Sequence, residues 1–233
     1  LNGVLERIER GVAAQRQFAA DASHELRTPL TVISTNLDVA RRKPRDPAHW
    51  EHVADDTMAE VARMTLLVDK LLVLSRAGPA GLSHARTDLR PLVASVVERL
   101  QTIARERDVT LELTPGAPTP AEIDADAINI VVDNLIRNAI DHSPKGERVT
   151  LTVGPDARIT VDDRGPGIPP DKRARIFEPF ARGIHRNTDR AAGTGTGLGL
   201  AICKRIVDGH RGQIRVDDRP GGGARFVVEL PAE

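Results

Sequence analysis

Ser23-His24-Glu25-Leu26-Arg27-Thr28-Pro29-Leu30 lies in the middle of a long heptad pattern, and this pattern decides the fold of the first third of the chain. Mostly apolar residues recur at steps that alternate between four and three, which is the repeat of a coiled coil or helical bundle. These seam positions are Leu5, Ile8, Val12, Gln15, Ala19, Ala22, Leu26, Pro29 and Ile33. His24 falls between two of them, so we expect its imidazole to point away from the buried stripe. A histidine held outward beside an acid, here Glu25, can take part in chemistry.

A second helix is expected from about residue 48 to 75, after a proline-rich turn at 44–47 that ends the first helix near residue 43. Its apolar stripe is wider than one seam, and such a helix packs on more than one neighbour. Because a hairpin offers each helix a single partner, we expect residues 1–76 to form an all-α helical hairpin that dimerises into a four-helix bundle.

The pattern changes after a linker predicted at 77–86, which begins with glycine, proline and alanine. Helices are expected at 89–107, 125–142 and 198–210, and strands at 109–113, 149–153, 159–161, 213–216 and 224–230. Because helices and strands alternate irregularly, residues 87–233 are predicted to form an α/β sandwich, with a mixed sheet packed on helices.

Bulk composition narrows the classes of function. Lysine and arginine total 33, as do aspartate and glutamate, so the formal net charge is zero. A general binder of nucleic acid or membrane surfaces would carry a basic excess, and we expect neither activity. The one cysteine, Cys203, fits a reducing compartment and is expected in the core. Because the chain starts inside the heptad pattern without a methionine, we expect a piece of a longer protein whose other segments make any membrane contact.

Asn134 and Asn138 lie four residues apart on the helix expected at 125–142 and therefore share one face. Neutral amides can hold Mg²⁺ and phosphate oxygens without adding charge repulsion. The alternative is a pair of solvent-facing asparagines. Asparagine is a poor helix former, so two on one face need a reason, but this motif alone leaves both alternatives open.

Two glycine-containing motifs follow. Asp163-Arg164-Gly165-Pro166-Gly167 comes after a β-rich run, where a buried carboxylate can accept a hydrogen bond from an amine such as adenine N6; in isolation, a simple turn is favoured. Gly193-Thr194-Gly195-Thr196-Gly197-Leu198-Gly199-Leu200 opens the helix expected at 198–210, and a helix N-terminus attracts phosphate. This run lacks the Lys-Ser/Thr of a P-loop, and a flexible linker is the alternative.

Taken in order with Phe177-Glu178-Pro179-Phe180, these motifs resemble the N, G1, F and G2 boxes of the histidine-kinase catalytic domain, a member of the ATPase superfamily shared with gyrase, Hsp90 and MutL. The octapeptide resembles the H box of the matching dimerisation and histidine-phosphotransfer domain. The resemblance covers essentially the whole chain. It implies the cytoplasmic core of a two-component sensor histidine kinase, with the phosphotransfer domain at 1–76, a linker at 77–86 and the catalytic ATP-binding domain at 87–233.

By this resemblance, His24 is the phospho-acceptor that attacks the γ-phosphate of ATP, and Glu25 is the general base that orients it and takes its proton. Thr28 matches the position that, in related kinases, positions water to hydrolyse the phosphorylated response regulator. Pro29 is expected to kink the helix just past the site.

In the ATP-binding domain, the resemblance makes Asn138 the Mg²⁺ ligand and Asp163 the partner of adenine N6, in a pocket shaped by Gly165 and Gly167. Asn134 stands where hydrolytic members carry a glutamate that activates water. Because an amide cannot act as that base, the site should transfer phosphate to His24 rather than hydrolyse ATP.

Residues 170–195 correspond to a mobile ATP lid, in which Arg182 matches a basic residue that approaches the phosphates. Gly195, Gly197 and Gly199 belong to the glycine box that follows.

One departure from the family pattern concerns Asp141 and His142, where many relatives carry Lys and Tyr. An acid cannot pair with phosphate. The lysine's contact is therefore missing or is supplied by Arg137, Lys145 or the lid.

Together these features imply a homodimeric protein histidine kinase that uses ATP and Mg²⁺, autophosphorylates His24 and passes the phosphoryl group to an aspartate of a response regulator. Thr28 indicates that it also removes that phosphate. The full-length protein is expected in the bacterial inner membrane, with this part facing the cytoplasm. The alternatives are a hydrolytic gyrase-type ATP clamp, which Asn134 and the H box disfavour, and a non-catalytic dimerisation scaffold, which the complete set of boxes disfavours.

Overall fold

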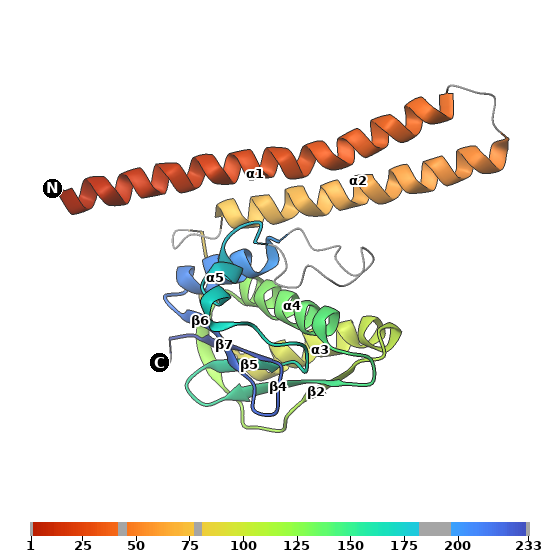
Figure 1. The fold of residues 1–233 in the computed structure, drawn as a ribbon. Helices are drawn as coiled ribbons and strands as arrows, with labels where there is room; N and C mark the ends of the chain where they lie inside the picture. The colour runs from red at the N-terminus through yellow and green to blue at the C-terminus, as the bar shows by residue number, and fades with distance from the viewer. Residues whose placement is uncertain (1, 42–45, 77–80, 182–196, 232–233) are drawn as a thin grey trace. The chain divides into compact units, whose positions relative to one another are not determined.

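The computed structural model describes residues 2–41, 46–76, 81–181 and 197–231, without the side chains of 2–18, 21, 66, 69, 70 and 74–76. The chain divides into two compact units, Leu1–Leu72 and Val73–Glu233. The first unit is a helical hairpin, and the second combines helices with strands (Figure 1). Among the described residues, no helix combines the length and the apolarity needed to cross a membrane.

The hairpin consists of α1 (Asn2–Arg41) and α2 (Pro47–Arg76). Asp46 caps α2, because its side-chain oxygen accepts the backbone N–H of His49 at 2.8 Å. One row of each helix is buried or half-buried, at steps of four and three residues. These rows are Ala22, Leu26, Pro29, Ile33, Asn36 and Ala40 on α1, and Val53, Thr57, Glu60, Met64, Leu67 and Leu71 on α2. The seam predicted from residue 22 to 33 is confirmed, whereas Ala19, predicted on the same seam, is exposed.

A second apolar row on α2 remains exposed in the single chain. It consists of Met58, Val61, Val68 and Leu72, whereas the exposed Trp50 lies three residues before Val53 in the register of the buried row; α1 likewise exposes Leu30, Val32, Leu37 and Val39. The α2 row follows the same heptad spacing as the buried row but on a different side of the helix. The wide apolar stripe predicted for the second helix is therefore two seams, of which α1 covers one.

Pro29 lies inside α1, which continues through it as one helix. The proline is buried on the seam that faces α2. The helix therefore continues through the proline without a break, and the kink predicted there stays a prediction.

The second unit contains twelve elements in the part of the chain that the structure describes, of which the helices are α3 (Leu89–Glu106), α4 (Ala125–His142) and α5 (Gly199–Gly209), with two 3₁₀ turns, η1 (Pro170–Lys172) and η2 (Arg175–Phe177). The strands are β1 (Ala85–Asp88), β2 (Thr110–Leu113), β3 (Pro120–Ile123), β4 (Arg148–Gly154), β5 (Arg158–Asp162), β6 (Gln213–Asp218) and β7 (Ala224–Glu229). Five strands form one sheet in the order β2-β4-β5-β7-β6. β2 and β4 are parallel and the other pairs are antiparallel, so the sheet is mixed, as predicted.

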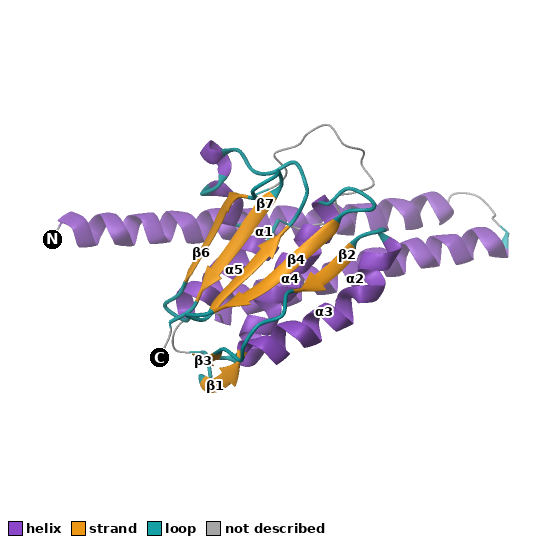
Figure 2. Ribbon diagram, turned by 90° about the horizontal axis from the view of Figure 1, so that it is seen from below, coloured by secondary structure: helices purple, strands orange, loops and turns teal. Residues whose placement is uncertain are grey.

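Helices α3, α4 and α5 cover one face of this sheet (Figure 2). The core between the two layers is mainly aliphatic and includes Leu100, Ile136, Leu151 and Phe226, all fully shielded. Cys203 is also fully buried, as predicted. The strands present threonine and charged side chains on the opposite face. There, Arg225 of β7 donates hydrogen bonds to both carboxylate oxygens of Asp162 of β5, at 2.7 and 2.6 Å.

Strands β1 and β3 were not predicted. They pair only with each other, antiparallel, as a separate ribbon. β1 begins at Ala85, so its first two residues lie within the range predicted for the linker, 77–86, and they pair with β3, which follows α3 and β2 in the chain. Four-residue strands that pair across such a distance leave no periodic signal in the sequence.

Candidate functional site

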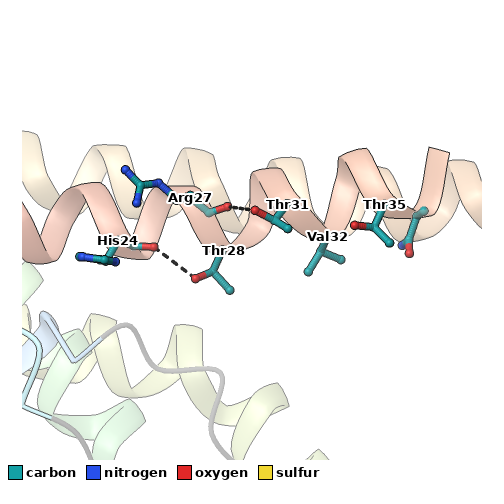
Figure 3. A pocket seen from close by; sticks show the side chains of 7 residues that line it. His24, Arg27, Thr28, Thr31, Val32 and Thr35 are labelled. Carbon is teal, nitrogen blue, oxygen red and sulfur yellow. Dashed lines mark hydrogen bonds between the residues drawn. The ribbon is translucent and has the colours of Figure 1, made fainter. Parts of the chain in front are cut away.

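His24 lies on the exposed side of α1, between the shielded residues Ala22 and Leu26. Figure 3 shows His24 and Thr28 projecting from the same side of the helix. The Thr28 hydroxyl donates to the carbonyl oxygen of His24 at 3.2 Å. Glu25 is half-buried beside it. The predicted outward orientation of the histidine is confirmed, and the catalytic roles of these side chains stay predictions.

A shallow hollow runs along α1 from His24 toward residue 36 (Figure 3). Its lining is mostly hydroxyl and amide groups: His24, Arg27, Thr28, Thr31, Val32, Thr35 and Asn36. The Thr31 hydroxyl donates to the carbonyl oxygen of Arg27 at 2.9 Å, so it is bonded to its own helix in the same way as that of Thr28. The histidine therefore stands at one end of a hollow lined by threonine, valine and asparagine side chains and one arginine.

Asn134 lies on the side of α4 that faces the start of α5. Its Nδ2 donates to the carbonyl oxygen of Ile130 at 2.9 Å. A Cβ placed on Gly199 would lie 2.8 Å from Asn134 Oδ1, so the amide oxygen packs directly against the first residue of α5. Asn138 is half-buried one turn further along α4, and among the described residues its side chain has no hydrogen-bond partner. The two asparagines line one face, as predicted.

Acidic residues of α4 face α3 instead. Asp133 accepts Arg137 Nε at 2.6 Å and Arg99 Nη2, from α3, at 3.4 Å. Two turns later, Asp141 lies 3.8 Å from Arg107, which follows α3. Arg137 and Asp141, whose relation to the nucleotide phosphates the sequence did not decide, therefore form ion pairs away from the face that carries the asparagines.

Asp163 directly follows β5 and is 3% exposed. Its Oδ1 accepts two backbone N–H groups, from Gly165 at 2.8 Å and from Ala224 at 3.0 Å. Burial raises the pKa of Asp163 above its ordinary value, and the N–H groups of Ala224 and Gly165 offset part of that rise. Both bonds use Oδ1, and among the described residues none donates a hydrogen bond to Oδ2.

The turn after Asp163 requires glycines. A Cβ on Gly165 would lie 2.6 Å from the carbonyl oxygen of His142, at the end of α4, and Gly167 has a φ of +74°. A third glycine, Gly223, was missed by the sequence analysis: its φ is +100°, and the Asp163 carbonyl oxygen lies so close that no side chain fits. The run of three glycines at 221–223 was the signal that could have found it.

The segment before α5 contacts the segment after η2. A Cβ on Gly197, whose φ is +70°, would lie 2.9 Å from the Cα of Phe180. Helix α4 therefore contacts both the turn after β5 and the start of α5, and the segment before α5 contacts the segment after η2. Gly195 and Arg182 lie outside the described residues, and the nucleotide-binding roles of all these positions stay predictions.

Two family models match the two units. The His Kinase A (phospho-acceptor) domain matches residues 14–80, and the family described as histidine kinase-, DNA gyrase B-, and HSP90-like ATPase matches 123–233. A solved structure of the mycobacterial sensor histidine kinase MprB is 32% identical, covers 65% of this chain and 99% of its own, and has a TM-score of 0.54. The chain belongs to the sensor histidine kinases.

Other sensor histidine kinases show the same likeness over almost the whole chain. CpxA of Escherichia coli (strain K12) is 34% identical over 99% of this chain and 50% of its own length. The histidine-protein kinase/phosphatase MprB of Mycobacterium avium (strain 104) is 34% identical over 99% of this chain and 45% of its own. The structure of full-length ShkA in complex with AMPPNP is 27% identical, with a TM-score of 0.64 over 93% of this chain and 46% of that one. The chain spans half or less of the length of the first relatives it matches.

Proposed function

We propose that this chain is the core of a two-component sensor histidine kinase that autophosphorylates His24 with ATP and passes the phosphoryl group to an aspartate of a response regulator. The observation that carries the proposal is that the two domains of one chain carry complementary groups. An exposed histidine stands on the phospho-acceptor domain, and the ATPase-family domain carries Asn134 where a hydrolytic enzyme needs a carboxylate. We place the first domain at 1–76, the linker at 77–86 and the second domain at 87–233.

The second unit suits an adenine nucleotide. Asp163 presents one carboxylate oxygen, which can accept the N6 amine of adenine, while backbone N–H groups fix the other. Close backbone contacts at Gly165, with the carbonyl oxygen of His142, and at Gly167, with that of Gly223, fix the turn that follows Asp163. The N-terminus of α5, preceded by glycines, supplies N–H groups and a partial positive charge for phosphates.

Asn138 fits a Mg²⁺ ion that accompanies the nucleotide. Its amide oxygen is neutral, half-buried and without a hydrogen-bond partner among the described residues. A bound Mg²⁺ neutralises charge on the phosphates and holds them for in-line attack. Asn134 has an amide fixed against Ile130 and cannot take a proton from water, so the site favours transfer to a better-placed nucleophile.

The nucleophile is the exposed imidazole of His24. A bond forms between an imidazole nitrogen and the γ-phosphorus, the bond from the γ-phosphorus to the bridging oxygen breaks, and ADP leaves. Glu25 takes the imidazole proton, an assistance typically worth about 10²–10⁴-fold. The aspartate of the regulator then attacks the phosphorus and restores His24.

A homodimer completes the helical unit. The exposed row on α2, centred on Val61 and Val68, has the spacing of a packed heptad seam but no covering helix in the single chain. Two hairpins that bury these rows against each other form a four-helix bundle. His24 lies outside the buried row and stays accessible in such a dimer.

The regulator is expected to dock on the α1 hollow that begins at His24. Thr28 stands one turn beyond the histidine on the same side, so its hydroxyl can position a water molecule toward a phosphorylated aspartate. This supports phosphatase activity, which the name of the M. avium relative also carries. Because ATP and response regulators are cytoplasmic, we infer that this part faces the cytoplasm, and that segments outside the chain hold the protein at the bacterial inner membrane.

One experiment separates the kinase from its alternatives. The chain and its His24→Ala variant are incubated with γ-labelled ATP and Mg²⁺, and protein-bound and free label are measured. We expect acid-labile label on the wild type and none on the variant, with nucleotide binding unchanged. Free phosphate without protein-bound label would indicate a hydrolytic clamp, and the absence of both would indicate a scaffold.

A further inference from the structure

A polar cluster lies where the chain enters the second unit. His210 follows the last residue of α5, Asp124 caps the start of α4, and Ser83 and His84 precede β1. The Ser83 N–H donates to Asp124 Oδ2 at 2.9 Å. The rings of His84 and His210 meet edge to face, with their centroids 5.0 Å apart. Three segments that are distant in the sequence are joined here.

The hydrogen bonds of His210 define its protonation state. The side chain is 3% exposed. Its Nε2 lies 3.0 Å from the backbone N of Asp124, and its Nδ1 lies 2.8 Å from the carbonyl oxygen of Ile206. A carbonyl only accepts, so Nδ1 carries a proton; an N–H only donates, so Nε2 must carry none. The cluster therefore requires a neutral imidazole.

The surroundings disfavour a second proton on this ring. Burial lowers the pKa of His210, and the neighbouring His84 lowers it further. The Ile206 carbonyl and the Asp124 carboxylate raise the pKa, but the net pKa lies below the ordinary value. His84 and Asp124 are the titratable groups that face it from the other segments, while Asp208 and Arg211 on its own side are exposed. A proton on Nε2 would point at the N–H of Asp124, and that N–H would lose its acceptor.

We propose that Ser83, His84, Asp124 and His210 form a proton-sensitive clasp, which fixes the segment before β1 while His210 is neutral and releases it when His210 gains a proton. Because the folded state holds the neutral form, the clasp is fully stabilising above about pH 6.5 and is weakened as the pH falls below that value.

Release frees the residues before β1 and so lengthens the connection between α2 and β1. Each freed residue adds up to about 3.3–3.6 Å of reach. Tether length sets the effective concentration at which one linked group meets another. The clasp would thereby adjust how often the ATP-binding unit meets the phospho-acceptor histidine, without any change in either site.

Amide hydrogen exchange of the full chain, followed by NMR, tests the clasp. Protection factors, which correct for the intrinsic pH dependence of exchange, are compared at about pH 7.5 and about pH 5.5, on either side of the ordinary histidine pKa. We expect protection of the Ser83 and Asp124 amides to fall roughly tenfold at the lower pH, together with titration of the His210 ring.

Two variants provide controls. His210→Gln offers Asp124 an uncharged acceptor and should keep its protection at both pH values. His84→Ala, at an exposed position, removes a neighbour that lowers the pKa, and should move the ring titration to higher pH with nucleotide binding at neutral pH unchanged.

Equal protection of the wild-type amides at both pH values would overturn the proposal, as would the same loss in His210→Gln. If that variant does not fold, the wild-type titration decides. A His210 ring that titrates while the Ser83 and Asp124 amides stay protected contradicts a clasp.

Discussion

His24 and Thr28 are exposed on a single turn of α1, and the hydrogen bond between them stays within that turn. Asp163, in contrast, is buried, and two backbone N–H groups hold it; one of them comes from Ala224, 61 residues further along the chain. The helical unit thus presents its chemistry on a surface that the helix alone positions. The second unit assembles its site from distant segments. Substitutions should therefore separate activity from stability more cleanly on α1 than around Asp163.

Asp163→Asn should give the largest change. The amide can still accept the two backbone N–H groups through its oxygen but presents a donor, not an acceptor, to adenine N6. Losing a hydrogen bond to a charged group of about 1.5–3 kcal/mol predicts roughly 10–150-fold weaker ATP binding, measured by calorimetry. Because burial raises the pKa of this carboxyl, the folded unit is destabilised by its ionised form above that pKa, and the neutral variant should unfold at the same or a higher temperature.

Asp162→Asn is the matched control for this prediction. The neighbouring carboxylate pairs with Arg225 on the open face of the sheet. Its loss should lower stability by about 1 kcal/mol and leave ATP affinity unchanged. Reduced stability in Asp163→Asn with unaltered ATP binding would contradict the assignment of Asp163.

Val61→Glu should weaken the dimer next. One buried valine is worth about 1.5–3 kcal/mol, so burying a charge in its place predicts at least a tenfold rise in the dimer dissociation constant, measured by analytical ultracentrifugation. Ala59→Glu, on an exposed side of α2 away from both apolar rows, is the control and should remain dimeric. If both variants associate equally well, the exposed row is not the dimer seam.

Thr28→Ala should have the smallest and most selective effect. The hydroxyl bonds only to its own helix in the structure, and a surface substitution of this kind changes stability by less than about 0.5 kcal/mol. We expect dephosphorylation of the phosphorylated regulator to slow roughly tenfold, within the range of one positioned catalytic group, while autophosphorylation of His24 stays near the wild-type rate. Thr31→Ala removes a comparable hydroxyl in the same hollow and should affect neither reaction; equal losses in the two variants would argue against a role for Thr28.

The sequence could predict features that depend on local spacing, but not features that depend on contacts between distant segments. The α1 seam and the outward His24 follow from heptad spacing, and the shared face of Asn134 and Asn138 follows from helical spacing, because both patterns are local. The ribbon of β1 with β3, the bond from Ala224 to Asp163 and the His210 cluster were not predicted. Each depends on a pairing between segments far apart in the chain, and no spacing rule encodes such a pairing.

The strand order of the second unit has a consequence for synthesis of the protein. β5 pairs with β7, whose residues 224–229 leave the ribosome late, and Asp163, which we propose binds adenine, follows β5 directly. Local hairpin contacts form quickly, whereas pairing of distant strands is slow. The histidine-bearing hairpin can therefore fold during translation, well before an ATP site exists. A newly made chain would meet its dimer partner first and its nucleotide afterwards.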